Sequence, residues 1–219
     1  AFAVQARADT DDMRQWVENE LKRSFKAVGF RVVEPKHGAD GRDGAVYVVN
    51  AVASHRTESR RIYGTPMQYT TLELNVSVAR RDTDELVATD KAEVTRGSSV
   101  TNAVGDAARF AVAKLFPRIR DRILSHWAGE IDTGWLLKVK VAGAPYPEVS
   151  DLCKRLQNLS AVKDARILAA SRKGITEIQL KGVLSGQDVA DRMAEWFGEA
   201  YTVALKGPRA VTATKPPAS

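Results

Sequence analysis

The sequence predicts an α+β protein of two consecutive domains, each built from a sheet packed by two helices. Between residues 69 and 127, two alternating strands joined by a polar turn run into one alanine-rich amphipathic helix. Residues 135–205 then follow the order strand, helix, strand, strand, helix, strand, which is typical of a ferredoxin-like βαββαβ sandwich. We place the first domain at residues 10–128, the second at residues 135–211, and a disordered tail at residues 212–219.

The first domain opens with a helix expected from about Asp11 to Val28. Thr10 or Asp11 is a suitable N-cap, and Gly29 is the expected terminator. Its apolar residues recur every fourth position, so one stripe of the helix faces a core. The residues of this stripe are Met13, Val17, Leu21 and Phe25.

Four strands are expected next, in an antiparallel or mixed sheet. A short strand at residues 30–33 is followed by a polar loop at 35–44 and a second strand at 45–54. In the third strand, alternate residues are apolar, which is the period of a half-buried strand. Its apolar residues are Leu72, Leu74, Val76 and Val78, and a charged turn then leads to a return strand at 86–94.

The long helix after Gly97-Ser98-Ser99 carries apolar residues at spacings of three and four up to Ile123. Pro117 lies inside it, and a kink or break is expected near Leu115, because proline lacks the backbone donor and clashes with the preceding turn. Residues 128–134 contain Gly, Glu, Asp and Thr and are expected to form the linker between the domains.

In the second domain, strands are expected near residues 135–141, 165–170, 175–180 and 201–205. A helix at 147–159 begins with a proline, and a second helix begins at Ser185, which with Asp188 forms a capping pair.

Composition restricts the function only broadly. The net charge of +6 comes from 33 basic residues interleaved with 27 acidic ones, a pattern typical of solvated surface. The longest apolar runs fall far short of the roughly 18–20 residues of a membrane-spanning helix, so no transmembrane segment is expected. The single cysteine, Cys153, lies among apolar residues and is interpreted as a buried hydrophobe. The small-x-small steps in residues 1–6 resemble the end of a signal peptide, which predicts an exported protein.

Motifs of enzyme and metal sites are missing from the sequence. It has no glycine-rich phosphate loop, no Gly-x-Ser-x-Gly elbow, no Cys-x-x-Cys and no His-x-x-x-His. We therefore expect no catalytic residues, no bound cofactor and no metal. The one concentration of titratable groups worth testing for an enzyme is His37, Asp40 and Asp43.

The polar stretch from Ser54 to Gln68 is interpreted as an extended hairpin arm or a loop. Arginine and tyrosine are enriched at protein interfaces, and this stretch carries both. The candidate contact residues are Arg56, Arg60, Arg61 and Tyr63.

Several segments of the first domain resemble a domain of bacterial envelope proteins. Residues 20–33 resemble its opening helix and strand, residues 44–49 are similar to its second strand, and residues 103–124 resemble its final alanine-rich helix. Residues 82–88 resemble its Thr-Gly-Glu turn, with Asp84 in place of Gly. The families that share this domain are the curli secretion lipoprotein, the Tol-system translocation protein B and flagellar assembly protein T.

The resemblance implies a periplasmic assembly or docking module without catalytic residues. It implies a structural component of a flagellar or secretion complex, with other envelope proteins and a second copy of the chain as partners, in a ring that associates with the outer membrane. The alternative is a nucleic-acid-binding module. RNA-recognition domains share the βαββαβ order, but residues 136–141 and 175–180 lack the aromatic residues on which bases stack, so nucleic acid is not the expected partner.

Overall fold

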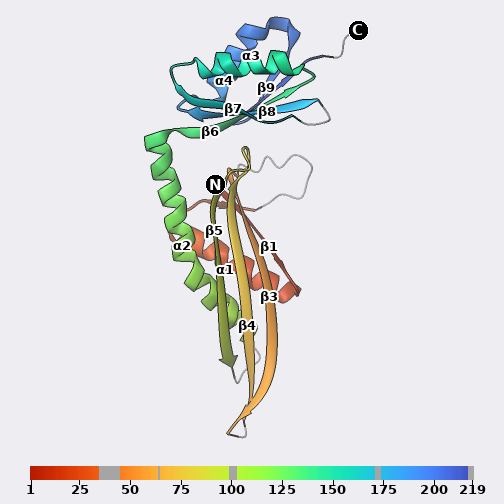
Figure 1. The fold of residues 1–219 in the computed structure, drawn as a ribbon. Helices are drawn as coiled ribbons and strands as arrows, with labels where there is room; N and C mark the ends of the chain where they lie inside the picture. Colours follow the sequence, from red (N-terminus) through yellow and green to blue (C-terminus); the bar gives the residue numbers. More distant parts are fainter. Residues whose placement is uncertain (35–44, 64, 99–102, 171–173, 217–219) are drawn as a thin grey trace. The chain divides into compact units, whose positions relative to one another are not determined.

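The computed structural model describes residues 1–34, 45–63, 65–98, 103–170 and 174–216. The chain divides into two compact units, residues 1–126 and residues 127–219. Each unit holds one five-stranded mixed sheet, and the described residues form four α-helices in all, so the α+β prediction is confirmed. Figure 1 shows the elements of each unit.

In the first unit the strand order is β2-β1-β3-β4-β5. The bounds are β1 Phe2–Ala8, β2 Val32–Val33, β3 Tyr47–Ile62, β4 Thr65–Arg80 and β5 Leu86–Ser98. Strand β1 runs parallel to both β2 and β3, whereas β3, β4 and β5 are antiparallel neighbours.

Strand β1 is a correction to the sequence analysis. Residues 1–6 were interpreted as the remnant of a signal peptide, but Phe2–Ala8 forms a strand of the sheet, with Phe2, Ala3 and Val4 buried. Small residues serve here to pack a covered strand. The small-x-small pattern therefore has a structural explanation and is no longer an argument for export.

Helix α1 (Asp11–Ala27) buries the predicted stripe of Met13, Val17, Leu21 and Phe25. The hydroxyl of Thr10 accepts a hydrogen bond from the backbone N–H of Met13, as expected of an N-cap. The ring of Phe25 lies 4.9 Å from that of Phe2 and 5.1 Å from that of Phe116 in α2 (Ala103–Thr133). Both helices therefore pack on the same face of the sheet, and the other face is left to solvent.

Helix α2 is longer than the sequence suggested. It continues through Pro117 and through residues 128–133, so the predicted break and the predicted linker are both wrong. The helix ends before Gly134, whose φ of +81° is the left-handed conformation that glycine favours at helix ends. Gly134, rather than Gly129, is the terminator.

In the second unit the strand order is β7-β8-β6-β10-β9. The bounds are β6 Trp135–Ala142, α3 Tyr146–Gln157, β7 Val162–Ala170, β8 Ile175–Gly182, α4 Gly186–Phe197, the 3-10 turn η1 Gly198–Ala200, β9 Thr202–Gly207 and β10 Ala210–Thr214. The predicted capping pair is confirmed, because the Ser185 hydroxyl accepts from the Asp188 backbone while the Asp188 carboxylate accepts from that of Ser185.

Strand β10 corrects the predicted sixth element and the predicted tail. Strand β9 was expected to complete the sheet, but it forms the edge, and β10 lies between it and β6, parallel to β6. Val211 and Ala213 are buried on the core side, which explains why this short strand belongs inside the sheet. Residues 212–214 are thus part of the fold and not of a disordered tail.

Candidate functional site

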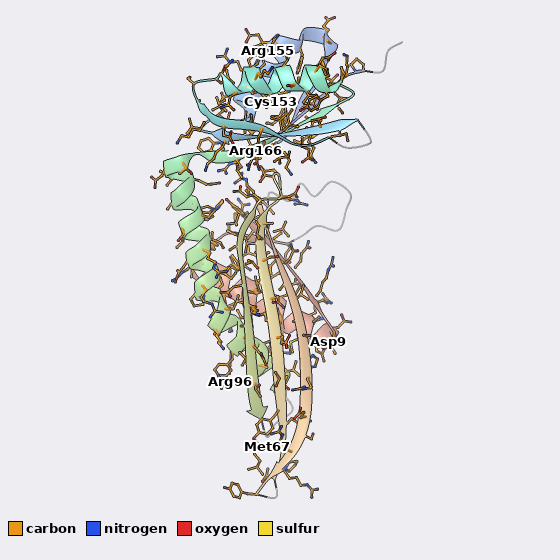
Figure 2. All side chains as sticks on the ribbon, viewed as in Figure 1. Asp9, Met67, Arg96, Cys153, Arg155 and Arg166 are labelled. Carbon is orange, nitrogen blue, oxygen red and sulfur yellow. The ribbon has the colours of Figure 1, made fainter. Side chains whose placement is uncertain are left out.

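The predicted hairpin arm exists as a long two-stranded ribbon. Strands β3 and β4 remain paired in register as far as Ile62 and Thr65. Strand β5 pairs with β4 only to the level of Gln68 and Ser98, so the last rungs of the ribbon extend past it (Figure 1). Figure 2 labels Met67 on this ribbon. We call residues 56–71 of β3 and β4 the arm.

The structure places all four predicted contact residues on the arm. Arg56, Arg60, Arg61 and Tyr63 are all exposed, and Tyr63 at the turn is completely so. Because strand side chains alternate between faces, Arg56 and Arg60 point away from the helix-covered side and Arg61 points to the other side. Tyr63 has a φ of +49°, a conformation uncommon for a bulky residue. Such strain tends to occur at functional positions.

Side-chain contacts across the ribbon hold the arm in its strand conformation. Glu58 accepts a hydrogen bond from Arg60 at 2.8 Å and lies 3.3 Å from Arg56. The hydrogen bond from Arg60 and the two positive charges lower the pKa of Glu58. The guanidinium of Arg60 also lies over the ring of Tyr69, 5.7 Å from its centre.

The free edge of β5 is covered by basic side chains of α2. The Lys114 ammonium donates to the Glu93 carbonyl at 3.2 Å, and Arg118 donates to the Lys91 carbonyl at 3.0 Å. Arg118 also pairs with Asp90 at 2.5 Å, which lowers the pKa of that carboxyl. Charged side chains on an edge discourage addition of another strand. The arm and the open face of the sheet are therefore better placed for contacts than this edge.

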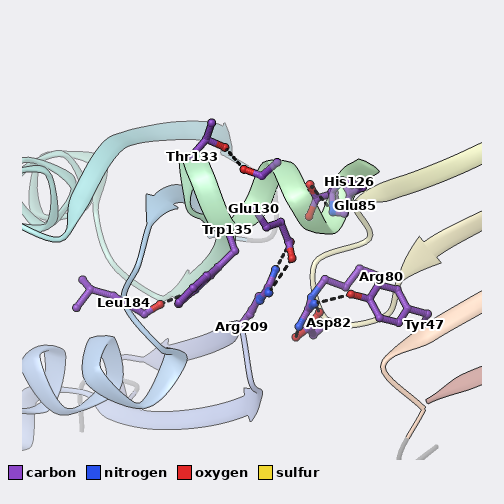
Figure 3. A network of polar contacts seen from close by, with 11 residues as sticks. Tyr47, Arg80, Asp82, Glu85, His126, Glu130, Thr133, Trp135, Leu184 and Arg209 are labelled. Carbon is purple, nitrogen blue, oxygen red and sulfur yellow. Dashed lines mark hydrogen bonds and ion pairs between the residues drawn. The ribbon is translucent and has the colours of Figure 1, made fainter. Parts of the chain in front are cut away.

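A buried arginine was missed by the sequence analysis. Arg80, assigned to a charged turn, is only 4% exposed and donates to Asp82 at 2.8 Å and to the Tyr47 hydroxyl at 3.2 Å (Figure 3). In the same unit, His126 lies 3.8 Å from Glu85. The signal for Arg80 was present, since it continues the buried alternation of β4. Its role is to hold the turn after β4.

The second unit has its own buried polar contacts. Arg209 forms an ion pair with Glu130, and the Trp135 indole donates to the Leu184 carbonyl at 2.7 Å (Figure 3). These contacts attach the turn before β10 and the start of β6 to their neighbours, which is a structural role.

A second polar cluster of this unit centres on Glu148 in α3. Its carboxylate accepts from the Tyr201 hydroxyl at 2.6 Å and from the Lys215 ammonium at 3.0 Å. Burial, reinforced by the bond to Glu148, raises the pKa of Tyr201, while the bond from Tyr201 lowers the pKa of Glu148. A pocket of about 360 Å³ adjoins the cluster, walled by Trp196 and Phe197. This cluster fastens the segment after β10 to α3.

Cys153 is half-buried on α3 and packs against the core of the second unit. Burial raises the pKa of its thiol, which disfavours the thiolate form that a nucleophile requires. Figure 2 shows its position. The thiol therefore fits the small hydrophobic role predicted for it.

The remaining sequence candidates are placed as follows. His37, Asp40 and Asp43 lie outside the described residues. Lys138 and Lys140 of β6 lie next to Glu177 of β8, at 3.9 and 3.3 Å. None of the helices within the described ranges is both long and apolar enough to cross a membrane.

Comparison with known proteins gives solved structures only. No family model and no curated protein matches the chain. Protein XCC0632 from Xanthomonas campestris is 17% identical over 60% of this chain and 86% of its own, with a TM-score of 0.38. Lipoprotein GNA1162 from Neisseria meningitidis is 11% identical over 52% of this chain and 95% of its own, with a TM-score of 0.38. The PelC dodecamer from Paraburkholderia phytofirmans is 19% identical over 54% and 85%, with a TM-score of 0.36. Likenesses at these scores assign neither a family nor a function to the chain.

Proposed function

We propose that this chain is a non-enzymatic structural component of a bacterial cell-envelope complex of the flagellar or secretion type, located in the periplasm. It acts through protein–protein contacts, with the arm as its main docking element. Its partners are other envelope proteins and a second copy of itself. The observation that supports this proposal best is the arm, an ordered ribbon that carries exposed arginines and an exposed tyrosine past the end of β5.

The arm has the properties of a docking element rather than of a solvated loop. Its strands stay in register to the tip, and Glu58 and Tyr69 hold the side chain of Arg60, so little conformational freedom remains to be lost on binding. Arginine and tyrosine contribute strongly to interfaces, because each combines a large apolar area with hydrogen-bonding groups. The resemblance of residues 11–127 to envelope assembly domains supports the same role.

The experiment is a double charge reversal, Arg60→Glu with Arg61→Glu, in the full chain. We expect the variant to lose self-association or partner capture, measured by analytical ultracentrifugation and by cross-linking in the native envelope. The melting temperature should stay nearly constant, because both side chains are exposed. The matched control is Arg192→Glu with Lys206→Glu, which makes the same charge change at exposed positions of α4 and β9. Unaltered assembly in the arm variant would contradict the proposal.

The second candidate function, nucleic-acid binding, has one observation in its favour. Arg166, Gln179 and Lys138 form a row across β7, β8 and β6 on the face opposite the core, next to Lys140. Binding through these cations would weaken linearly in the logarithm of salt concentration as counterions are released. A labelled single strand titrated at several salt concentrations separates this function from docking, which the arm variant alone should impair.

A further inference from the structure

The open face of the first sheet carries charge in an alternating order along the strands. Even-numbered residues of β3 lie on this face, since the odd-numbered residues 47–53 are buried against the helices. Cross-strand pairing groups the side chains into rows. From the sheet into the arm, the rows are Ser54–Glu73–Glu93, Arg56–Thr71–Thr95, Glu58–Tyr69–Gly97 and Arg60–Met67. Their charges are negative, positive, negative and positive in turn.

The first of these rows is electrostatically incomplete. Glu73 and Glu93 face each other directly on neighbouring strands, an arrangement in which like charges repel. Both side chains are exposed, and within the described part of the chain no cationic group lies within 4.0 Å of either carboxylate. They border a pocket of about 470 Å³ that Thr95 and Lys114 also line. A cation from outside the chain would relieve the repulsion.

The same chain presents such a cation at the right spacing. Arg60 lies six residues along β3 from Ser54, which corresponds to about 20 Å at the rise of an antiparallel strand. If a second copy packs on this face with its strands reversed, the Arg60 row of each copy lies over the Glu73 row of the other. The Arg56 row then lies over the Glu58 row of the partner. Every negative row faces a positive row.

The next rows outward agree with this arrangement. Val52 is 54% exposed and Ile62 is 39% exposed, although both are apolar. Reversal about the level of residue 57 places Val52 of one copy over Ile62 of the other. The contact would therefore bury two exposed apolar side chains in each copy in addition to pairing the charges.

Other ways of joining two copies fit less well. With the strands parallel and in register, each row would face its own copy, and four glutamates would meet. Addition at the β5 edge is opposed by Lys114 and Arg118, which already bind the outward carbonyls. The reversed arrangement has a two-fold axis, so both surfaces are used once by each copy and the assembly closes.

We infer that the open face of β3, β4 and β5, from Val52 to Ile62, is a self-complementary surface that binds a second copy of this chain in a reversed, two-fold arrangement. The inference rests on the proposed docking role of the arm and specifies its partner. Ring or envelope assembly would then be built from such pairs.

Adjacent arginines provide the test, because they lie on opposite faces of the arm. In the full chain, Arg60→Glu should weaken the dimer at least about tenfold, since close charge pairs at interfaces couple strongly and each pair occurs twice. Arg61→Glu makes the same charge change one residue away and should alter the dissociation constant by less than about twofold. Glu73→Lys with Glu93→Lys should weaken the dimer as Arg60→Glu does. Sedimentation equilibrium gives each constant, and thermal melting confirms that each variant is folded.

Combining the reversals gives the decisive measurement. The triple variant with Arg60→Glu, Glu73→Lys and Glu93→Lys restores opposite charges across the interface, so its dissociation constant should return to within about threefold of the original. Equal weakening by Arg60→Glu and Arg61→Glu, or a triple variant no tighter than its parents, would overturn the inference. An unaltered chain that stays monomeric at millimolar concentration would also overturn it. If the arm variants still lose capture of other envelope proteins in that case, the proposed function stands without it.

Discussion

Removal of the Phe25 ring tests the core of the first unit most directly. Phe25 is fully buried, and its ring lies within 5.7 Å of those of Phe2, Phe30 and Phe116. Phe25→Ala therefore leaves a cavity between α1, β1 and α2, with three rings that cannot all move to fill it. Such a change costs about 3–5 kcal/mol. We expect about 4 kcal/mol, because aromatic contacts of about 0.5–1.5 kcal/mol each are lost as well.

The measurement is urea unfolding followed by far-UV circular dichroism, with hydrogen exchange to assign the loss to residues 1–126. Exchange is needed because a chain of two units need not unfold in one step. Trp16→Ala in the same helix is the control. Its side chain is already 40% exposed, so its removal should cost less than about 2 kcal/mol. A loss below about 1 kcal/mol for Phe25→Ala would show that α1 does not pack as described.

Three further predictions concern other parts of the chain. Residues 135–216 should fold alone, with a dispersed NMR spectrum, whereas residues 135–209 should not, because they lack β10 from the inside of the sheet; a folded shorter fragment would contradict the strand order. Asp84 has a φ of +56°, so Asp84→Gly should be about 1 kcal/mol more stable than Asp84→Ala in urea unfolding, and equal stabilities would exclude backbone strain there. The raised pKa of Tyr201 implies stability that is complete below the unfolded value near 10 and is lost as pH rises above it, a loss that Tyr201→Phe should remove from the pH profile of unfolding. The lowered pKa of Glu148 has the opposite sign, so its stabilisation is present above the unfolded value near 4.5 and is lost as pH falls, which acid unfolding of Glu148→Gln should show.

The sequence alone determined the elements whose signal is local. The four-residue steps of Met13 to Phe25 predicted α1, and the alternation of Leu72 to Val78 predicted the buried face of β4. Ser185 and Asp188 predicted a helix start, because a capping pair spans only four residues. The arm was predicted as one of two possibilities, since its polar residues fit a hairpin and a loop equally well. Repetition within a short window is enough to identify such features.

Tertiary structure decided whatever depends on partners distant in the sequence. Strand β1 is recognised only by its pairing with β3 about 45 residues later, and β10 only by its parallel pairing with β6. Neither segment has a long period of its own, and parallel pairing is not encoded by a neighbouring turn. Arg80 is buried because Asp82 and Tyr47 satisfy its donors. The charge rows from Ser54 to Arg60 likewise exist only because the register of three strands places Glu73 beside Glu93. Cross-strand register, which no single segment specifies, is what brings the candidate surface together.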